Sequence, residues 1–477
     1  MGPRRHLIWA FSYLRFRFPI GLTWISSQET VVSDATATPP ESTVILGAGV
    51  IGLSTAYYLA LTLNEATALS PVLVRHVVVV VEPSNDICPG ASGQATGGLG
   101  DFGFGPETTP LGSLSYLLHK NLASEFGGKD KYGFNDLNIY RVSPKNFTGT
   151  PSPPHSWGPA PPVAKNVSDL PNWIEHSKDW TAQLLADDLH SSHLDPRRFC
   201  QFLRERCEKL GVKFLLNSTV TSLERDDIRQ GFASVTIRTK ESEPSDHVIP
   251  CNSIVIAAGP WTDRVFMTLF PAARLKVPMN ATNSAGNHIL VRNPHWKSSD
   301  DEKGNSQVFL NGILPGPDRL DITAFVGGSL YLGGYGATPE PLPDYADSVE
   351  AQPDKVNAMI ELARKYLCLG LHEKLEVLNT GRCYRPLAMP NKPIITKVEW
   401  DLLGDISPQT SSIIRQYVAP HEGLDCQPSP VISGLYINTG HNSDGVTLAP
   451  GSGKVMSELL LGRTPSVDIS RLGLDPS

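Results

Sequence analysis

Three glycines between two apolar runs constrain the fold of this chain more than any other feature. Residues 42–60 read STVILGAGVIGLSTAYYLA, in which the run VIL leads into Gly47-x-Gly49-x-x-Gly52 and then into an Ala/Leu-rich run at 53–59. The first run is typical of a strand buried on both faces, and the second predicts a helix. In such a unit the glycines permit a tight turn, close approach to a pyrophosphate, and packing of helix on strand. The turn therefore predicts a nucleotide site at the N-terminus of a helix.

A second apolar strand that ends in an acid supports this prediction. Five valines at 77–81 stand directly before Glu82. A carboxylate at this strand end can accept hydrogen bonds from a ribose diol. Glu82 follows Gly52 by 30 residues (82 − 52), whereas the usual spacing is about 20. We expect a loop over 63–75 to take up the difference. The alternative is a structural glycine turn beside an unrelated valine-rich strand.

Composition and charge exclude several classes of protein. With 477 residues the chain has room for two or more domains. A formal net charge of −7 gives no reason to expect a nucleic-acid partner. There is no run of about 20 apolar residues, so no integral membrane segment is expected. The seven cysteines lack CxxC spacing, which predicts reduced thiols rather than a disulfide framework or a metal site.

The first 28 residues differ from the rest of the chain. They carry four arginines and no acid, among aromatic and aliphatic residues. Such a segment is typical of an organelle presequence of the mitochondrial kind, and an extension without any address is the alternative. Localisation therefore stays open between cytoplasmic and organellar. A polar linker at 30–41 leads into the first strand.

Glycine-rich segments recur far downstream of the first turn. Residues 88–105 follow the acid-terminated strand, and residues 434–462 predict a strand, a glycine loop and a terminal helix. We therefore expect an α/β (α+β) fold in which a Rossmann-like domain is assembled from separated segments. A substrate domain with a mixed or antiparallel sheet would be inserted between them, leaving a ligand crevice. The predicted division is an N-terminal extension and linker (1–41), a cofactor-binding domain (42–100, 193–265 and 376–472) and a substrate domain (101–192 and 266–375).

Six segments in order resemble one enzyme superfamily. They are VILGAGVIGLSTA, EPSNDICPGASGQATGG, HLDPRRFCQFLRERCEKLGVKFLLNSTV, IVIAAGPWTDRV, CYRPLAMPNKPII and GLYINTGHNSDGVTLAPGSGK. Together they resemble the FAD-dependent D-amino-acid oxidase superfamily, which includes glycine and sarcosine oxidases. The resemblance spans residues 42–472 and implies FAD bound without a covalent link.

The resemblance also implies which residues contact the cofactor. In order along the chain they are the pyrophosphate turn (Gly47, Ala48, Gly49, Val50, Ile51, Gly52), the ribose acid Glu82, the second loop (Ser92, Gly93, Thr96), Val220 at the adenine, the strand end Gly259, and the loop beneath the flavin (Gly440, Asp444, Gly445, Val446, Thr447). We expect a helix to open after Pro450, with N–H groups that stabilise negative charge on reduced flavin. Asp444 would oppose that charge unless it points to solvent.

The same resemblance implies candidates at the substrate end. Arg385 in CYRP would pair with a substrate carboxylate, because a planar guanidinium suits bidentate recognition. The alternative is an arginine that braces the strand end against an acid. His441 is either a hydrogen-bonding group for substrate or flavin, or an ordinary loop histidine. Cys383 stands one residue out of register with the cysteine that tethers flavin in sarcosine-type enzymes, so we expect a structural thiol. Tyr331 and Tyr335 either line the pocket or simply alternate along a strand.

The implied reaction is oxidation of a C–N bond in an amino acid, an N-alkyl amino acid or an amine. A hydride would pass to flavin N5, the imine would be hydrolysed, and O2 would accept the electrons to give H2O2.

One alternative is a dehydrogenase of a hydroxy acid or specialised metabolite that uses a quinone or carrier. A flavin-binding but inactive protein for trafficking or assembly is another. An NAD-dependent enzyme is disfavoured, because a nicotinamide site would not require the two further glycine loops. The expected partners are a small-molecule substrate and O2.

Overall fold

The computed structural model describes residues 42–69, 76–226, 230–241, 243–280, 282, 284–302, 304–312, 320–335, 340–370, 373–404 and 431–474. The arginine-rich segment 1–28, the linker 30–41 and Cys426 lie outside these ranges, as does the side chain of Tyr335. The expectations for them stay predictions. All described residues fall in one compact unit, Pro40–Ser477, so the division into two domains also stays a prediction.

A six-stranded sheet carries the first glycine turn at its centre. Its strand order is β18-β19-β12-β1-β2-β8, and every neighbouring pair is parallel except β18 with β19. The strands are β1 (Ser42–Leu46), β2 (Val77–Val81), β8 (Lys213–Leu215), β12 (Ser253–Ile256), β18 (Ile394–Val398) and β19 (Gly434–Thr439).

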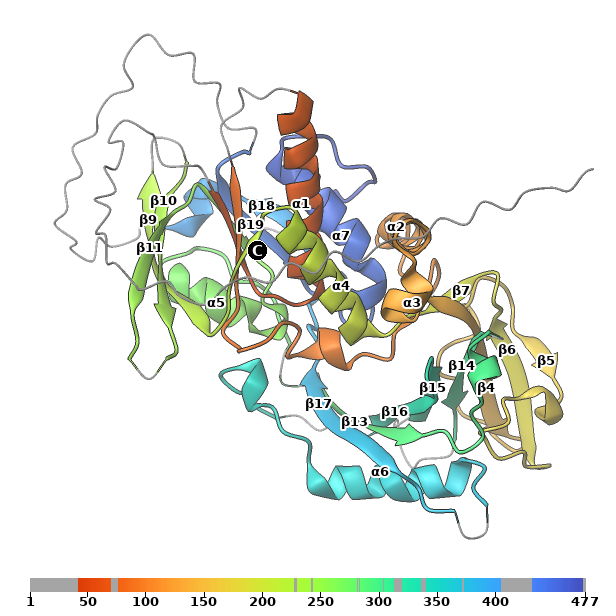
Figure 1. Cartoon of the computed structure of the whole chain (residues 1–477). Helices are drawn as coiled ribbons and strands as arrows, with labels where there is room; N and C mark the ends of the chain where they lie inside the picture. The colour runs from red at the N-terminus through yellow and green to blue at the C-terminus, as the bar shows by residue number, and fades with distance from the viewer. Residues whose placement is uncertain are drawn as a thin grey trace, which may run out of the picture. The chain divides into compact units, whose positions relative to one another are not determined.

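Both faces of this sheet are covered, which explains the continuous apolar runs in its strands. Ile45 packs with helices on one face, whereas Val44 and Leu46 pack on the other face with β10 and α5. The helices of the first face lie side by side (Figure 1): α1 (Val50–Leu69), α4 (Pro196–Lys209) and α7 (Gly445–Leu460). The second face carries α5 (Thr262–Leu269) and a small antiparallel sheet of β9 (Ser218–Asp226), β10 (Gly231–Thr239) and β11 (Asp246–Pro250).

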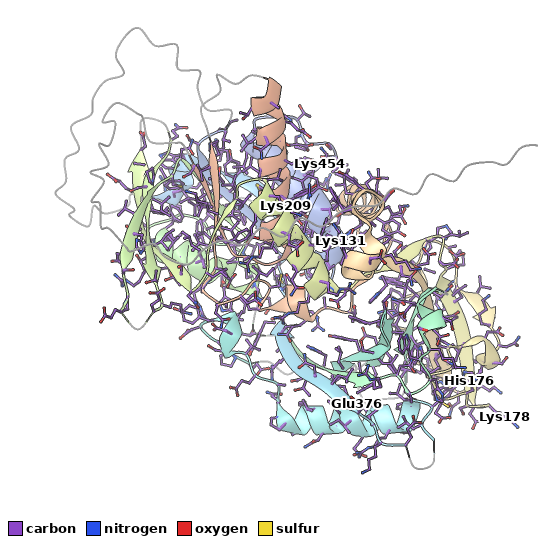
Figure 2. All side chains as sticks on the ribbon, in the orientation of Figure 1. Lys131, His176, Lys178, Lys209, Glu376 and Lys454 are labelled. Carbon is purple, nitrogen blue, oxygen red and sulfur yellow. The ribbon has the colours of Figure 1, made fainter. Side chains whose placement is uncertain are left out.

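Helix α1 is longer than the sequence predicts. It continues to Leu69, so the loop expected to begin at residue 63 is in fact two further turns of helix. The helical turns therefore account for much of the unusual distance between the glycine turn and Glu82. Figure 2 labels one lysine on each of three helices of this part of the molecule, Lys131, Lys209 and Lys454.

A second, ten-stranded sheet confirms the predicted mixed or antiparallel type. Its main order is β17-β13-β16-β15-β14-β4-β6-β5; β7 also pairs with β4, and β3 pairs with β7. Strands β14 and β4 form its parallel pair. Helix α6 (Pro353–Tyr366) packs on its apolar face (Figure 1). The strands are β3 (Gly98–Gly100), β4 (Asn135–Pro144), β5 (Val163–Lys165), β6 (Trp180–Ala186), β7 (Ser191–His193), β13 (Ala285–Arg292), β14 (Asn305–Leu310), β15 (Leu320–Phe325), β16 (Ser329–Tyr335) and β17 (Val377–Tyr384).

Three elements pack away from the rest of the predicted segment to which they belong. Strand β17 belongs to the predicted cofactor segment 376–472, yet it pairs with β13 at the edge of the ten-stranded sheet. Helices α2 (Thr109–Phe126) and α3 (Gly128–Tyr132) belong to the predicted substrate segment 101–192, yet they pack in the core around α1, α4 and α7. Segments from both predicted domains therefore contribute to the same packed regions.

Two sequence expectations concern membranes and thiols. Within the described part of the chain, no helix has the length and the apolar character that a membrane crossing requires. The six described cysteines are all free thiols, and five of them are buried.

Candidate active site

A cavity of about 1060 Å³ opens at the carboxyl ends of the central strands of the six-stranded sheet. Gly49, Glu82 and Gly259 line it beyond β1, β2 and β12, while Tyr331 and Arg385 line it from the ten-stranded sheet. Ligands of open α/β sheets bind at such strand ends. The volume lies just above the usual range of about 300–1,000 Å³ for small-molecule sites, so the cavity suits a large ligand.

The cavity brings together most, but not all, of the residues predicted from the sequence. Those that line it are Gly47, Gly49, Val50, Ile51, Glu82, Ser92, Thr96, Val220, Gly259, Gly445, Val446, Arg385 and His441. Those that do not line it are Ala48, Gly52, Gly93, Gly440, Asp444 and Thr447. Members of this second group lie beside the cavity wall rather than on its surface.

The glycines of the first turn are required by close backbone contacts. Gly47 has φ of +113°, and a Cβ there would lie 2.5 Å from the carbonyl oxygen of Ala257. A Cβ on Gly52 would lie 2.0 Å from the carbonyl oxygen of Gly47. Gly52 therefore lets α1 pack against the turn, which is the role the motif predicts for the third glycine.

Glu82 ties the first turn to the second strand. Its Oε2 accepts the Ala48 N–H at 2.8 Å, and its Oε1 accepts the Ser84 N–H at 3.1 Å. Burial raises the pKa of this carboxyl, while the two backbone N–H groups act in the opposite direction. A carboxylate has about four acceptor positions, so Glu82 retains capacity for the hydroxyls of a ribose.

The second predicted loop docks directly on the first. Ser92 Oγ accepts the Val50 N–H at 3.0 Å, and the Cys88 N–H donates to the Ala48 carbonyl at 3.1 Å. Gly93 lies off the cavity because it packs on this loop: a Cβ there would lie 2.4 Å from the Cys88 carbonyl oxygen. The two loops therefore form one continuous wall.

The third predicted loop begins at Gly440 and leads into α7. Gly440 has φ of +75°, and a Cβ there would lie 2.7 Å from the Cβ of Ala388. Asp444 does not line the cavity. The repulsion expected between its carboxylate and the negative charge of a reduced flavin therefore has no carboxylate of Asp444 on the cavity surface to produce it. The Thr447 hydroxyl donates to the Gly98 carbonyl at 3.3 Å instead of facing the cavity.

The expected start of the last helix is wrong. Helix α7 begins at Gly445, and Pro450 lies inside it rather than before it. Gly445 and Val446, in the first turn, are the part of the helix that lines the cavity. The N–H groups at the cavity are therefore those of the turn before the proline.

His441 lies on the cavity wall as a neutral imidazole. It is 1% exposed, and its Nε2 lies 2.8 Å from Ser452 Oγ. Burial lowers its pKa to about 3. A group with this pKa is a poor proton acceptor near pH 7, so His441 can contribute a hydrogen bond but little general base catalysis.

Arg385 presents a guanidinium to the cavity from the end of β17. It lies over Gly286 of β13, where a Cβ would come within 2.8 Å of Nη1. Its Nη1 donates to the Ser284 carbonyl at 3.4 Å, and no carboxylate of the described residues forms an ion pair with it. By contrast, the nearby Arg382 pairs with Glu340. The described residues thus give no support to a bracing ion pair at Arg385.

Other side chains complete the substrate end of the cavity. Cys383 lines it, and burial raises the pKa of this thiol. The Tyr331 hydroxyl donates to the Gln94 carbonyl at 3.0 Å, and its ring stacks on His288 with centroids 4.8 Å apart. Sequence reasoning missed Asp321, which also lines the cavity, because an acid in an alternating strand carries no motif.

Sequence reasoning also missed a segment that covers one part of the cavity, residues 341–346, which we call the strap. Asp344, Tyr345 and Ala346 of the strap line the cavity. Arg264 of α5 donates to the carbonyls of residues 342 and 343 at 3.0 Å each and contacts Asp344 at 3.1 Å. Lys240 Nζ lies 3.3 Å from the centre of the Tyr345 ring. The strap thus connects the ten-stranded sheet to the nucleotide side of the cavity.

The cavity wall fits an extended dinucleotide such as FAD. Gly259 lines the cavity with φ of +54°, and a Cβ built on it meets no atom within 4 Å, so a side chain there would occupy the open space. The three glycine-bearing loops contribute backbone, and Glu82 contributes acceptors, as a pyrophosphate and a ribose require. Among the described residues, no group of three His, Cys, Asp or Glu side chains forms a metal site.

Comparison with known proteins agrees with this geometry. A family model described as FAD dependent oxidoreductase matches residues 42–459. A Schizosaccharomyces pombe protein that is named as an oxidoreductase is 24% identical over 446 residues, which cover 90% of this chain and 96% of that protein.

Solved structures of 15–19% identity share the fold. Glycine oxidase from Bacillus cereus has a TM-score of 0.60 at 19% identity and covers 91% of this chain and 97% of its own. L-proline dehydrogenase from P. horikoshii has a TM-score of 0.62 at 16% identity, with the same coverage of 91% and 97%. Because the family model covers most of its length, this chain belongs to the FAD-dependent oxidoreductases of the D-amino-acid oxidase superfamily, whose enzymes typically bind FAD without a covalent link.

Proposed function

We propose that this enzyme oxidises the C–N bond of an amino acid or an N-alkyl amino acid and binds its substrate through the carboxylate. One observation carries the proposal: the Arg385 guanidinium lines the cavity and has no ion-pair partner among the described residues. A half-buried guanidinium favours a carboxylate ligand, which it can hold with two parallel hydrogen bonds. The relatives and fold neighbours named as glycine oxidase, L-proline dehydrogenase and 4-methylaminobutanoate oxidase act on molecules of this class.

The side chains around Arg385 favour the reactive form of such a substrate. Burial raises the pKa values of Tyr331 and Cys383 and lowers that of His441, so these lining groups stay neutral near pH 7. These neutral groups favour the neutral amine over the ammonium, whereas Asp321, which also lines the cavity, acts in the opposite direction. FAD held by the glycine loops and Glu82 would supply the acceptor for the hydride that leaves the substrate carbon; the amine nitrogen would lose its proton to give an imine, which water would hydrolyse. The residues therefore orient the substrate rather than abstract a proton from carbon.

Anaerobic titration of the FAD-loaded protein tests this proposal. The panel contains amino acids, N-methyl amino acids and, for each of them, the corresponding amine that lacks the carboxylate. The measurement is the loss of absorption by the oxidised flavin. We expect reduction by carboxylate-bearing substrates. Arg385→Ala should weaken their apparent affinity about 10- to 150-fold, and Arg385→Lys should weaken it less because it keeps the charge. Equal reduction by the carboxylate-free amines, or unchanged affinity in Arg385→Ala, would contradict the proposal.

The proposed electron acceptor is O2, which would yield H2O2. A quinone or a carrier protein is the alternative, since proteins of this fold include both an oxidase and a dehydrogenase. Parallel assays of oxygen consumption and dye reduction on the same substrate separate the two. Peroxide formed in proportion to substrate supports an oxidase, whereas dye reduction without peroxide supports a dehydrogenase.

A further inference from the structure

The turn of α7 that faces the cavity is weakened by the proline inside the helix. Val446 lines the cavity, and Pro450 follows it by four residues. In a regular helix the N–H of residue 450 would donate to the carbonyl of residue 446, but proline has no N–H. Val446 is 7% exposed, so its carbonyl has little access to water. A buried carbonyl requires a partner from elsewhere in the molecule.

Helix α2 supplies the missing partner. His119, which is fully buried, places its Nε2 2.9 Å from the Val446 carbonyl oxygen. Because a carbonyl only accepts, this nitrogen carries the proton. Burial lowers the pKa of His119 to about 4, so the imidazole remains neutral and the assignment of its single proton holds across the physiological range.

A second side chain of α2 bonds to the next pair of backbone groups along α7. Ser115 lies one turn before His119, on the same helix face. Its Oγ donates to the Thr447 carbonyl at 2.6 Å and accepts the Gly451 N–H at 2.9 Å, so it bridges two groups that would otherwise bond each other. Gly451 admits α2 this closely, because a Cβ there would lie 2.9 Å from the Ser115 Cβ.

We propose that His119 is a positioning residue for the flavin end of FAD, acting through the Val446 carbonyl to hold the first turn of α7 in place. The inference rests on the implied location of the flavin over residues 440–447, and it is independent of the substrate. N–H groups and the dipole at a helix start favour negative charge, which the reduced flavin carries. A looser first turn stabilises that charge less, so the flavin midpoint potential should become more negative and FAD should bind more weakly.

Two substitutions of His119 separate the hydrogen bond from the packing. His119→Leu removes the donor, whereas His119→Gln retains an N–H at a similar reach. The measurements are the flavin midpoint potential by dye equilibration, the absorption spectrum of bound flavin and the FAD dissociation constant. We expect His119→Leu to shift the potential to more negative values and to raise the dissociation constant about 2- to 10-fold, and His119→Gln to remain close to the wild type.

Three further variants keep the test decisive. Leu122→Ala removes buried volume from the same helix without touching a polar contact, and it should lower thermal stability while leaving the potential unchanged. Ser115→Ala should shift the potential in the same direction as His119→Leu. It therefore replaces His119→Leu as the test variant if His119→Leu does not fold. Pro450→Ala restores an N–H at residue 450, so it should reduce the effect of His119→Leu. Equal shifts in the Leu and Gln variants, or shifts no larger than that of Leu122→Ala, would overturn the proposal.

Discussion

Glycines on the cavity wall serve two different physical purposes. At Gly47 the backbone conformation and the Ala257 carbonyl leave no room for a Cβ, so this residue is required by the fold itself. At Gly259 a Cβ has space, because the position opens on the cavity. The first glycine thus preserves the turn, and the second preserves room for the ligand.

This difference leads to a prediction for two matched substitutions. Gly47→Ala should lower the free energy of unfolding by about 2–4 kcal/mol, because strain at positive φ adds to a backbone clash. Gly259→Ala should lower it by only about 1 kcal/mol, for the left-handed conformation alone, but should weaken FAD binding. Urea unfolding and flavin fluorescence titration measure the two effects. Normal FAD affinity in Gly259→Ala would show that the cofactor does not approach this strand end.

Which side chains face the cavity could be predicted only where a motif fixes the backbone. Gly49, Glu82 and Arg385 line the cavity because each follows directly from a strand end that a motif marks, and their roles in binding stay predictions. Thr447 and Asp444 do not line the cavity, because a motif gives the position of a residue in the chain but not the direction of its side chain; their predicted contacts with the cofactor stay predictions. Asp321 was missed because nothing local distinguishes it.

At the scale of elements, the strap links the two sheets across the cavity. Arg264 makes three polar contacts to it, and the Trp261 indole N–H donates to the carbonyl of residue 343 at 2.7 Å. Residues 341–343 of the strap belong to no helix or strand. The hydrogen bonds from Arg264 and Trp261 therefore hold this part of the strap in place. The strap lines the same cavity as the first glycine turn and Glu82, which suits a segment that retains the cofactor.

Arg264→Ala should therefore accelerate FAD release several-fold, because three contacts to the strap are lost together. The dissociation rate can be followed by trapping released flavin, and limited proteolysis should cut the strap faster in the variant. Arg292→Ala is the matched control: Arg292 forms an exposed ion pair with Glu376, which Figure 2 labels, and does not contact the strap. An unchanged release rate in Arg264→Ala would exclude a retaining role.

The end points of α1 and α7 show why element boundaries were harder to predict than the elements. A proline normally marks the start or the end of a helix, which is why the sequence placed the last helix after Pro450. The carbonyl that Pro450 leaves unpaired is satisfied by His119, more than 300 residues earlier in the chain. No local pattern reveals such a distant partner. By contrast, the strand and the turn at 44–52 follow from local rules alone.

On the scale of the whole molecule, the sequence predicted a discontinuous nucleotide-binding fold and a second sheet of mixed type. It did so because glycine turns and buried strands carry local signals. The allocation of α2 and β17 was not predictable, because an amphipathic helix or an alternating strand does not specify which of two cores it joins. Packing of complementary surfaces decides that allocation.

Buried neutral histidines should make the folded protein sensitive to mild acid. Burial lowers the pKa values of His119, His193 and His288 to about 4 and that of His441 to about 3. An unfolded histidine has a pKa of about 6.5, so between about pH 6.5 and 4 the unfolded state binds protons that the folded state does not. Stability should therefore fall as pH falls through this window, by about 1.4 kcal/mol per pH unit for each histidine.

Urea unfolding at several pH values between 7.5 and 5 measures this dependence. His193→Gln removes one titrating group while keeping a donor for the Thr96 carbonyl, so it should flatten the slope by about one proton. The raised pKa of Glu82 acts with the opposite sign and reduces the total slope. Constant stability from pH 7 to 5 would contradict the assignment of neutral buried histidines.

The wall of the cavity combines the turn at Gly47–Gly52 with the first turn of α7, which begins at Gly445. During synthesis on the ribosome these two parts appear 393 residues apart (445 − 52). At about 5–20 residues per second that interval is roughly 20–80 s. During this interval the nascent chain carries β1 and α1 without α7, so the wall of the cavity stays incomplete until α7 has been synthesised.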